Sequence, residues 1–165
     1  MRRIAARVGC TPMALYGYYP SKIDILRQLW AELFDALFAD LGAVASQSPK
    51  PADRLQAVSL SYVTYWLENP EHYRMVFMSD GVAQPDVSIF VNQDRISEHY
   101  SLFHALIGAV SPAEDAAAKP RAEALICALN GIAHNLITMS GYAWSPPDRL
   151  VAVIVAGLIS EIGSD

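Results

Sequence analysis

The stretch from Ser21 to about Val44 has the clearest hydrophobic pattern in the chain. Its apolar residues recur at steps of three and four, at Ile23, Leu26, Trp30, Leu33, Phe34, Leu37, Phe38 and Leu41. This period places them on one face of an amphipathic helix. Ser21 can cap the first turn, with Asp24 at the spacing of a capping box. We therefore predict one helix that spans roughly 35 Å, at about 1.5 Å per residue.

Two short helices are predicted before it. The first covers residues 2–8 and ends at Gly9, which is suited to a left-handed turn. Thr11 can cap the second, with Pro12 at its first position, and Pro20 ends it because a proline disfavours helical geometry in the preceding residue. Two short helices around a glycine turn, followed by a long helix, are typical of a helix-turn-helix that presents a recognition helix to DNA.

The residues that begin and end elements in the rest of the chain predict helices and almost no strands. The expected helices cover about 52–68, 69–78 with Asn69 as the cap, 87–107, 121–140 and 147–162. Polar loops are expected at 46–51, 79–86 and 141–146, and residues 111–114 have the sequence of a capping box. We predict an all-α fold with an incomplete helix-turn-helix head and a helical-bundle regulatory and dimerisation domain.

Charge separates the head from the rest of the chain. Residues 1–27 carry five basic side chains and one acidic one, 5 − 1 = +4, whereas the whole chain carries 12 − 17 = −5, so residues 28–165 carry −9. A basic head on an acidic body predicts that only the head meets a polyanion. The five basic residues are Arg2, Arg3, Arg7, Lys22 and Arg27.

Composition narrows the class of protein. Apolar residues make up 53% and charged residues 18%, which is more apolar than a typical soluble monomer, so we expect a partner to cover part of the surface. No stretch reaches the roughly 20 apolar residues of a membrane span, and the start does not resemble a signal peptide, so we expect a cytoplasmic protein without membrane contact.

No set of residues predicts catalysis, a cofactor or a metal. Cys10 and Cys127 stand in unrelated contexts, and the four histidines (72, 99, 104 and 134) lack the spacing of a metal site. The sequence has no nucleophile elbow, glycine-rich phosphate loop or paired-carboxylate site. We expect a protein that is not an enzyme; an all-α enzyme is the remaining alternative.

The head resembles the tetracycline-repressor (TetR) family of transcriptional regulators. The resemblance lies in Arg3-Ile4-Ala5-Ala6-Arg7-Val8-Gly9, then in Leu15-Tyr16-Gly17-Tyr18-Tyr19-Pro20-Ser21-Lys22 and the long helix that follows. A weaker likeness to one subgroup of the family's regulatory domains covers residues 65–77 and 129–134, although that subgroup often has His-Gly where this chain has Asn130-Gly131.

The resemblance implies DNA contacts. Tyr16 and Lys22 match family positions that contact the DNA backbone, where a phenol and an ammonium can each reach a phosphate oxygen. The alternative is that Tyr16 packs into the small core and Lys22 is simply solvated. The resemblance places Arg2, Thr11, Pro12, Met13, Gly17 and Tyr18 at base-facing or backbone-facing positions, and Leu15 and Tyr19 in the core.

The resemblance also implies a further helix ahead of the head. Family members begin with a helix that packs over the helix-turn-helix, and this sequence starts at Met1 with the next one. We therefore expect the two short helices to be poorly held, since short isolated helices are marginal. A truncated ligand-binding dimer without operative DNA binding is the alternative to a regulator.

The body of such proteins encloses an effector pocket and forms a dimer. Candidate ligand-binding residues are aromatic or lie one turn apart on an apolar helix: Phe34, Tyr62, Trp66, Tyr73, Phe77, Phe103, Asn130 and His134. Their alternative role is plain core. The last two helices resemble half of a four-helix bundle between two subunits. The expected interface is Leu125, Leu129, Ile132, Leu136, Val151, Ile154, Val155 and Leu158.

These expectations combine into one function. Residues 1–44 form the truncated DNA-binding region with its connecting helix, and residues 45–165 bind the ligand and dimerise. The homodimer would bind a palindromic operator in double-stranded DNA. An apolar or aromatic small molecule would release it from the operator or retain it there.

Overall fold

The computed structural model describes residues 1–78, 94–111 and 116–163, with the backbone alone for residues 94–98. Every regular element in these ranges is an α-helix, so the predicted all-α class is confirmed. The helices are α1 Arg2–Val8, α2 Pro12–Tyr18, α3 Lys22–Gln47, α4 Pro51–Glu68, α5 Pro70–Phe77, α7 Asp94–Val110, α8 Ala118–Thr138 and α9 Pro147–Ile162.

The observed bounds follow the predicted ones closely. Helix α3 extends to Gln47, beyond the predicted end at Val44, and α8 begins at Ala118 and ends at Thr138 instead of covering 121–140. Pro120 lies in the first turn of α8, where a proline does not interrupt the helical hydrogen bonds. The predicted loop at 79–86, the start of a helix at 87 and most of the capping box at 111–114 lie outside the described residues.

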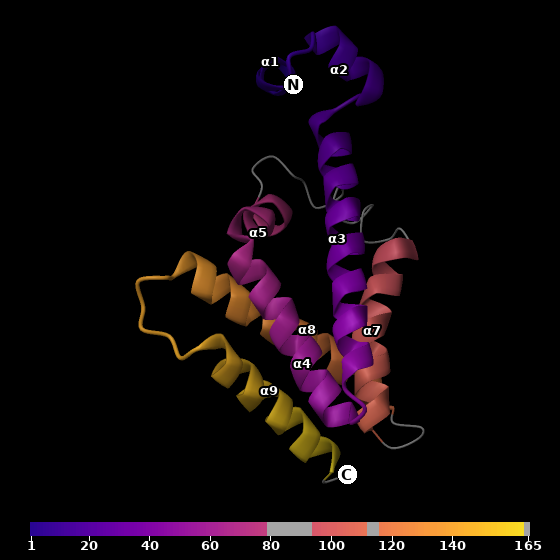
Figure 1. Ribbon diagram of the computed structural model, residues 1–165, viewed down its shortest axis with the longest axis vertical. Helices are drawn as coiled ribbons and strands as arrows, with labels where there is room; N and C mark the ends of the chain where they lie inside the picture. Colours follow the sequence, from indigo (N-terminus) through magenta and orange to yellow (C-terminus); the bar gives the residue numbers. More distant parts are fainter. Residues whose placement is uncertain (79–93, 112–115, 164–165) are drawn as a thin grey trace.

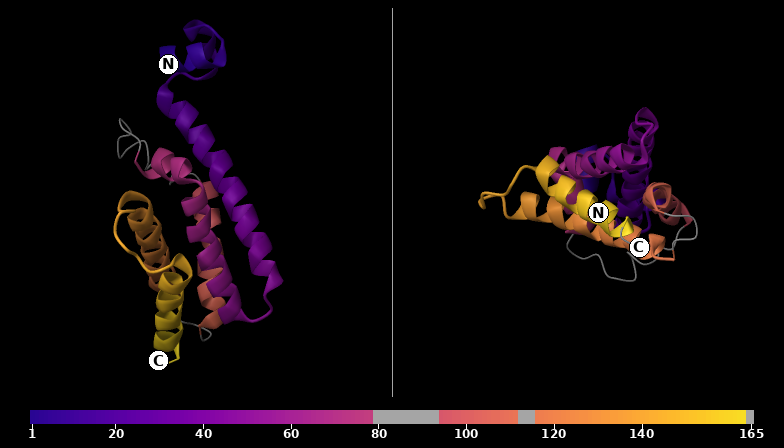
Figure 2. Two further views of the ribbon diagram at one scale, coloured as in Figure 1. Left: turned by 60° about the vertical axis from the view of Figure 1, so that its left-hand side comes forward. Right: turned by 90° about the horizontal axis from the view of Figure 1, so that it is seen from below.

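Helix α3 connects a small head to a larger body (Figure 1). The head, α1 and α2, lies at one end of α3, and the rest of α3 runs along the body; the turned view shows the same separation (Figure 2). Helix α4 occupies the centre of the body, packed against α3, α5, α7, α8 and α9. It is therefore buried on several sides, and its fully buried side chains are Leu55, Val58, Ser59, Tyr62, Val63 and Trp66.

The head is held by local signals that the sequence predicted. Gly9 has φ 77° and ends α1 in the left-handed region, where a residue without a Cβ is favoured. Thr11 Oγ1 accepts a hydrogen bond from Ala14 N at 3.1 Å, which caps α2. Ser21 Oγ accepts from Asp24 N at 3.3 Å and donates to Asp24 Oδ2 at 2.6 Å at the start of α3.

Asn69 differs from its prediction. It stands before the first residue of α5, but its side chain makes no capping bond there. Its Nδ2 instead donates to Tyr65 O at 2.9 Å, so the side chain satisfies a carbonyl at the end of α4. Asn69 thus joins two helices at their shared corner.

The head has little core of its own. Helix α1 packs against α2, and Ala5 and Leu15 are their buried residues, which confirms the prediction for Leu15. Tyr19 is half-buried, and its hydroxyl donates to Gln28 Oε1 at 2.9 Å, so it ties the end of α2 to α3.

Candidate functional site

All eight residues predicted to contact DNA have exposed side chains or backbone on the head. The most exposed large side chains are Met13 and Tyr18, at 81% and 82%, and Tyr16 is 49% exposed. Apolar side chains of this size that are so exposed remain in contact with water unless a partner covers them. Tyr16 therefore does not pack into the head's core, which was the alternative role considered for it. The remaining five of the eight residues are Arg2, Thr11, Pro12, Gly17 and Lys22.

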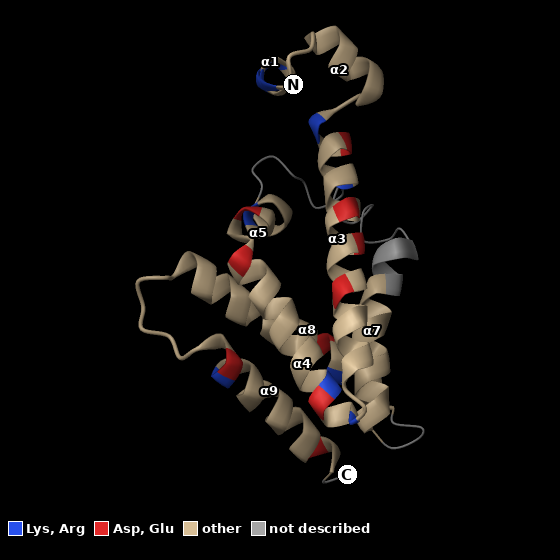
Figure 3. Ribbon diagram, in the orientation of Figure 1, with Lys and Arg blue, Asp and Glu red and all other residues tan. Residues whose placement is uncertain are grey.

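Basic residues gather at the head, and acidic residues begin along α3 (Figure 3). Arg2, Arg3 and Arg7 lie on α1 and are exposed, and Lys22 begins α3. Arg27 forms an ion pair with Asp24, at 3.6 Å between Nη1 and Oδ1, so part of its charge is neutralised locally. The positive potential of the head therefore comes from α1 and from the start of α3.

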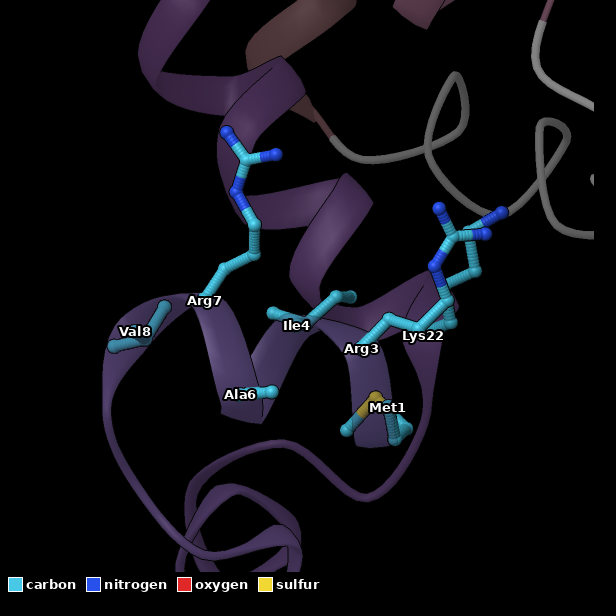
Figure 4. Close-up of a pocket in the computed structure, with 7 residues that line it drawn as sticks. All are labelled: Met1, Arg3, Ile4, Ala6, Arg7, Val8 and Lys22. Carbon is cyan, nitrogen blue, oxygen red and sulfur yellow. The ribbon is translucent and has the colours of Figure 1, made fainter.

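An open hollow lies beside α1 and has a volume of about 810 Å³. Met1, Ile4, Ala6 and Val8 contribute an apolar lining. The close-up shows Arg3 and Lys22 near each other on one side of it and Arg7 on the other (Figure 4). This face of α1 is thus apolar in the middle and basic at its borders.

The eight predicted ligand-binding residues form one connected group, the aromatic cluster: Phe34, Tyr62, Trp66, Tyr73, Phe77, Phe103, Asn130 and His134. Ring contacts run from Phe34 to Trp66 (centroids 6.1 Å apart), from Trp66 to Tyr62 (6.0 Å) and from Tyr62 to Phe103 (5.6 Å). They also run from Trp66 to Tyr73 (5.7 Å) and from Tyr73 to Phe77 (4.7 Å). Residues from α3, α4, α5, α7 and α8 therefore meet at one place.

Polar groups of α8 complete the cluster. Tyr62 Oη donates to Asn130 Oδ1 at 2.8 Å, and Tyr73 Oη lies 3.2 Å from His134 Nδ1. Asn130 and His134 are one turn apart, so both face α4 and α5. His134 and Phe77 are exposed, whereas Tyr62, Trp66 and Tyr73 are buried. The cluster thus reaches from the core to the surface.

Burial determines the protonation of the phenols. It raises the pKa of Tyr62 well above its ordinary value, and the nearby Tyr100 raises it further. Burial also raises the pKa of Tyr73 and of Tyr100. These hydroxyl groups therefore keep their protons at neutral pH, which allows Tyr62 Oη to donate its hydrogen bond to Asn130 Oδ1.

Alkaline pH should destabilise the protein through these tyrosines. In the unfolded chain a tyrosine ionises near pH 10. Because the folded pKa of Tyr62 is raised, its stabilising contribution is complete below about pH 10 and is lost as the pH rises further. The free energy of unfolding, measured with urea at several pH values between 8 and 11, should fall steeply with pH for the wild type and less steeply for Tyr62→Phe. The exposed Tyr142→Phe should follow the wild type; identical slopes for all three would contradict this prediction.

Two further contacts join α3 to the body, and no sequence motif indicated them. Trp30 Nε1 donates to Met75 O at 3.2 Å, which ties α3 to α5 beside the cluster. His99 of α7 stacks on Phe38 of α3 at 4.9 Å, and its Nε2 lies 3.1 Å from Asp35 Oδ1. The only sequence signal was the position of Trp30 and Phe38 in the apolar stripe of α3. A pattern in one helix does not identify the partner on another.

The predicted dimer residues divide into two groups. Leu125, Leu129, Val151 and Val155 are buried within the single chain, so they cannot form its surface. The prediction that they face a second subunit is therefore corrected: they pack against α4 and against each other's helix. Ile132, Leu136, Ile154 and Leu158 are partly buried.

Small residues form the outer face of α9. Ala152, Val153, Ala156 and Gly157 are exposed, Val153 at 72%, and no charged residue lies between Leu150 and Ser160. A hollow of about 290 Å³ separates this face from α8 and is lined in part by Ala124, Ala128 and Gly157. Helices with small residues can approach each other closely, and an uncharged exposed face of this length is typical of a covered surface.

Two other kinds of feature, a metal site and a membrane-spanning helix, are absent from the described ranges. No group of three or more histidine, cysteine, aspartate or glutamate residues could hold a metal ion there. Among the same helices, none is both long and apolar enough to cross a membrane.

Comparison with known proteins identifies the fold. No protein-family model matches the chain, and no curated protein matches its sequence significantly. Solved structures do match. A bacterial regulatory protein of the TetR family from Rhodococcus RHA1 has a TM-score of 0.69 and 20% identity, with 98% of this chain and 84% of that one covered.

A second solved structure agrees with the first. A transcriptional regulator of the TetR/AcrR family from Thermobifida fusca YX-ER1 has a TM-score of 0.61 and 20% identity, with 96% of this chain and 84% of that one covered. Both alignments include the head and the body, because they extend over nearly the whole chain. The chain therefore has the fold of the TetR-family regulators, and the fold implied by the motif of its head is confirmed.

Proposed function

We propose that the chain is a TetR-type transcriptional regulator, a homodimer whose affinity for a palindromic operator changes when a small molecule binds its body. The observation that carries this proposal is the placement of the predicted DNA contacts. All eight are exposed on a basic head, which is held at one end of α3 on an acidic body. The fold shared with solved regulators supports it.

The head has the groups that duplex DNA requires. Tyr16 and Lys22 supply a hydroxyl and an ammonium for phosphate oxygens, which fix the position of the protein without reading sequence. Arg2 can form two hydrogen bonds to a guanine, and the exposed Met13 can contact the methyl group of a thymine. Two heads would enter successive major grooves about 34–36 Å apart for half-sites one helical turn apart.

The outer faces of α8 and α9 serve as the dimer interface in this proposal. The exposed small residues of α9 and the hollow beside α8 together form an uneven surface that is mostly apolar, with Glu161 at one border of the hollow. A second copy related by a twofold axis would place its own α8 and α9 on it, which gives a four-helix bundle. This also accounts for the high apolar content of the chain.

The aromatic cluster serves as the effector site. It reaches the surface at Phe77 and His134, and it contacts α3 directly through Phe34. Trp30 adds a second connection between α3 and α5. A molecule bound in the cluster would therefore act on the helix that holds the head, with a coupling of roughly 1–3 kcal/mol between effector and operator.

Selection from a random-sequence duplex library, followed by fluorescence anisotropy, tests DNA binding. We expect a palindromic site and an affinity that falls steeply with salt. Lys22→Ala should weaken binding to all sequences to a similar extent and reduce the salt slope by about one. Lys50→Ala, an exposed lysine at the start of α4, is the control and should leave both unchanged. Binding that is insensitive to salt, or unaffected by Lys22→Ala, would contradict the proposal.

One observation favours a second function. The hollow beside α1 leaves an apolar face of the head open, and α1 and α2 share little core. In this alternative the chain is a ligand-binding dimer whose head does not engage DNA. The same selection decides between the two functions. In the alternative, no DNA sequence would be enriched, although the dimer and its ligand binding would persist.

A further inference from the structure

We propose that a groove between α3 and α7 binds the anion of a linear aliphatic carboxylic acid, with the carboxylate on Arg54 and the chain along Leu102. This site is separate from the proposed effector site in the aromatic cluster, and it does not depend on DNA binding. Three features carry the proposal: two adjoining hollows, a guanidinium without a counter-charge at one end, and an acidic side chain at the other end that sets the direction of the ligand.

The groove follows one stripe of residues on each helix. Helices α3 and α7 pack side by side (Figure 1). One hollow, with a volume of about 320 Å³, is lined by Asp35, Phe38, Ala39, Gly42, His99 and Leu102, and a second, of about 310 Å³, by Ala45, Ser46, Arg54, Leu102, Ala105 and Leu106. Leu102 lines both hollows. The lining residues of each helix recur at steps of three and four, so the hollows adjoin along one groove.

The middle of the groove is apolar and open. Ala39 and Gly42 on α3 and Ala105 on α7 are exposed small residues. A Cβ placed on Gly42 would meet no atom within 4 Å, so the groove is open above this glycine. From His99 to Leu106 helix α7 extends about 10 Å, at about 1.5 Å per residue. Hollows of this size suit an extended saturated chain, whereas an α-helix of a partner, about 10–12 Å in diameter, needs far more room.

Arg54 gives one end of the groove a positive charge. Its Nε donates to Ser48 O at 3.0 Å and its Nη2 to Pro49 O at 3.3 Å, so the guanidinium is held at the corner between α3 and α4. Both acceptors are neutral carbonyl groups, and no acidic side chain of the described residues forms an ion pair with Arg54. A guanidinium has five N–H groups, so Nη1 can still donate to a carboxylate.

The opposite end of the groove has an acidic side chain. Asp35 Oδ1 lies 3.1 Å from His99 Nε2, and the side chain of Asp35 is 39% exposed. A ligand carboxylate at this end would meet a charge of its own sign, whereas at the other end it meets Arg54. The stacked rings of Phe38 and His99, 4.9 Å apart, offer an apolar contact instead. The charges therefore place the carboxylate at Arg54 and the methyl end of the chain toward these rings.

Three probes with the same chain and different head groups test the ligand class: octanoate, 1-octanol and octylammonium. We expect octanoate to bind the full chain about tenfold more tightly than 1-octanol, because a charge-assisted hydrogen bond is added at a partly exposed site. Octylammonium should bind most weakly. From butanoate through hexanoate to octanoate, affinity should rise about two- to fourfold per added carbon, since each CH₂ leaves water. Isothermal titration calorimetry measures each affinity.

Two variants with matched controls locate the site. Arg54→Met should abolish the preference for octanoate over 1-octanol, and Arg149→Met, at an exposed arginine of α9, should keep it. Gly42→Leu fills the groove and should weaken octanoate and 1-octanol at least tenfold. Gly108→Leu, at an exposed glycine of α7 that lines neither hollow, should leave both affinities unchanged. Leucine is a better helix former than glycine, so neither leucine variant should impair folding.

Each other result overturns a stated part of the proposal. Equal affinity for octanoate and 1-octanol, or a preference that survives in Arg54→Met, excludes Arg54 as the partner of the carboxylate. Tighter binding of octylammonium excludes an anionic ligand. Unchanged binding to Gly42→Leu excludes the groove. If no probe binds, the ligand site is excluded, and a lower mass of Gly42→Leu in solution would then show that a second copy of the chain covers the groove.

Discussion

Trp30→Ala should lower the free energy of unfolding by about 3–5 kcal/mol, as expected for removal of a fully buried tryptophan. Trp30 is 1% exposed on α3, and its indole donates to Met75 O, so it holds α3 against α5. A domain of this size is stable by about 5–15 kcal/mol, so this single change removes a large share. Urea unfolding at one fixed protein concentration measures it, because the proposed dimerisation would make stability depend on concentration.

Two variants separate packing from hydrogen bonding at this position. Trp30→Phe keeps an aromatic ring and loses the bond to Met75 O, so it should cost clearly less than Trp30→Ala. Trp144→Ala removes a half-exposed indole from the loop between α8 and α9 and should also cost less. If Trp30→Ala lowers the free energy of unfolding no more than Trp144→Ala does, the contact between α3 and α5 is not needed for the fold.

Ala156→Glu should convert the proposed homodimer to monomers. Ala156 lies on the outer face of α9, where the exposed residues are small and uncharged. In the proposed four-helix bundle two copies of the new carboxylate would be buried near the twofold axis without a partner, and an uncompensated buried charge costs about 3–5 kcal/mol. The dissociation constant should therefore rise by at least about a hundredfold. Sedimentation velocity over a range of concentrations measures this.

The matched control is Ala109→Glu, the same change at an exposed alanine on α7. It should leave the mass in solution unchanged and alter stability little, as surface substitutions usually do. If Ala156→Glu has the same mass as the wild type, the outer face of α9 is not the interface. DNA binding should also weaken in Ala156→Glu, because a monomer contacts only one half-site.

The sequence predicted the helices well because their signals are local. The apolar period of α3, the capping residues Thr11 and Ser21 and the turn at Gly9 all act within a few residues of where they stand. The residues predicted to contact DNA came from a motif in one short segment, and all of them are exposed. Asn69 shows the limit, since its side chain can serve either the helix before it or the helix after it.

Residues on α8 and α9 were harder to assign, for a physical reason. Both helices have apolar residues around most of their circumference, so a period cannot distinguish the side that packs on α4 from the side that we propose to meet a second copy. Leu125 and Val151 face inward, and Ala152 and Val153 face outward. The deciding factor is the position of α4 at the centre of the body, which is a property of the whole fold. The contact of Trp30 with α5 and that of His99 with α3 likewise depend on how the helices are arranged in the whole fold.

The continuity of α3 has a mechanical consequence. The helix has 26 residues and no break, so it spans about 39 Å as one stiff rod. Its far end is fixed in the body and its near end carries the head (Figure 1). A tilt of only about 5° at the base displaces the tip by about 3 Å, from the length of such a rod. A displacement that is small where the rings of the body pack thus becomes, at the head, comparable to the length of a hydrogen bond.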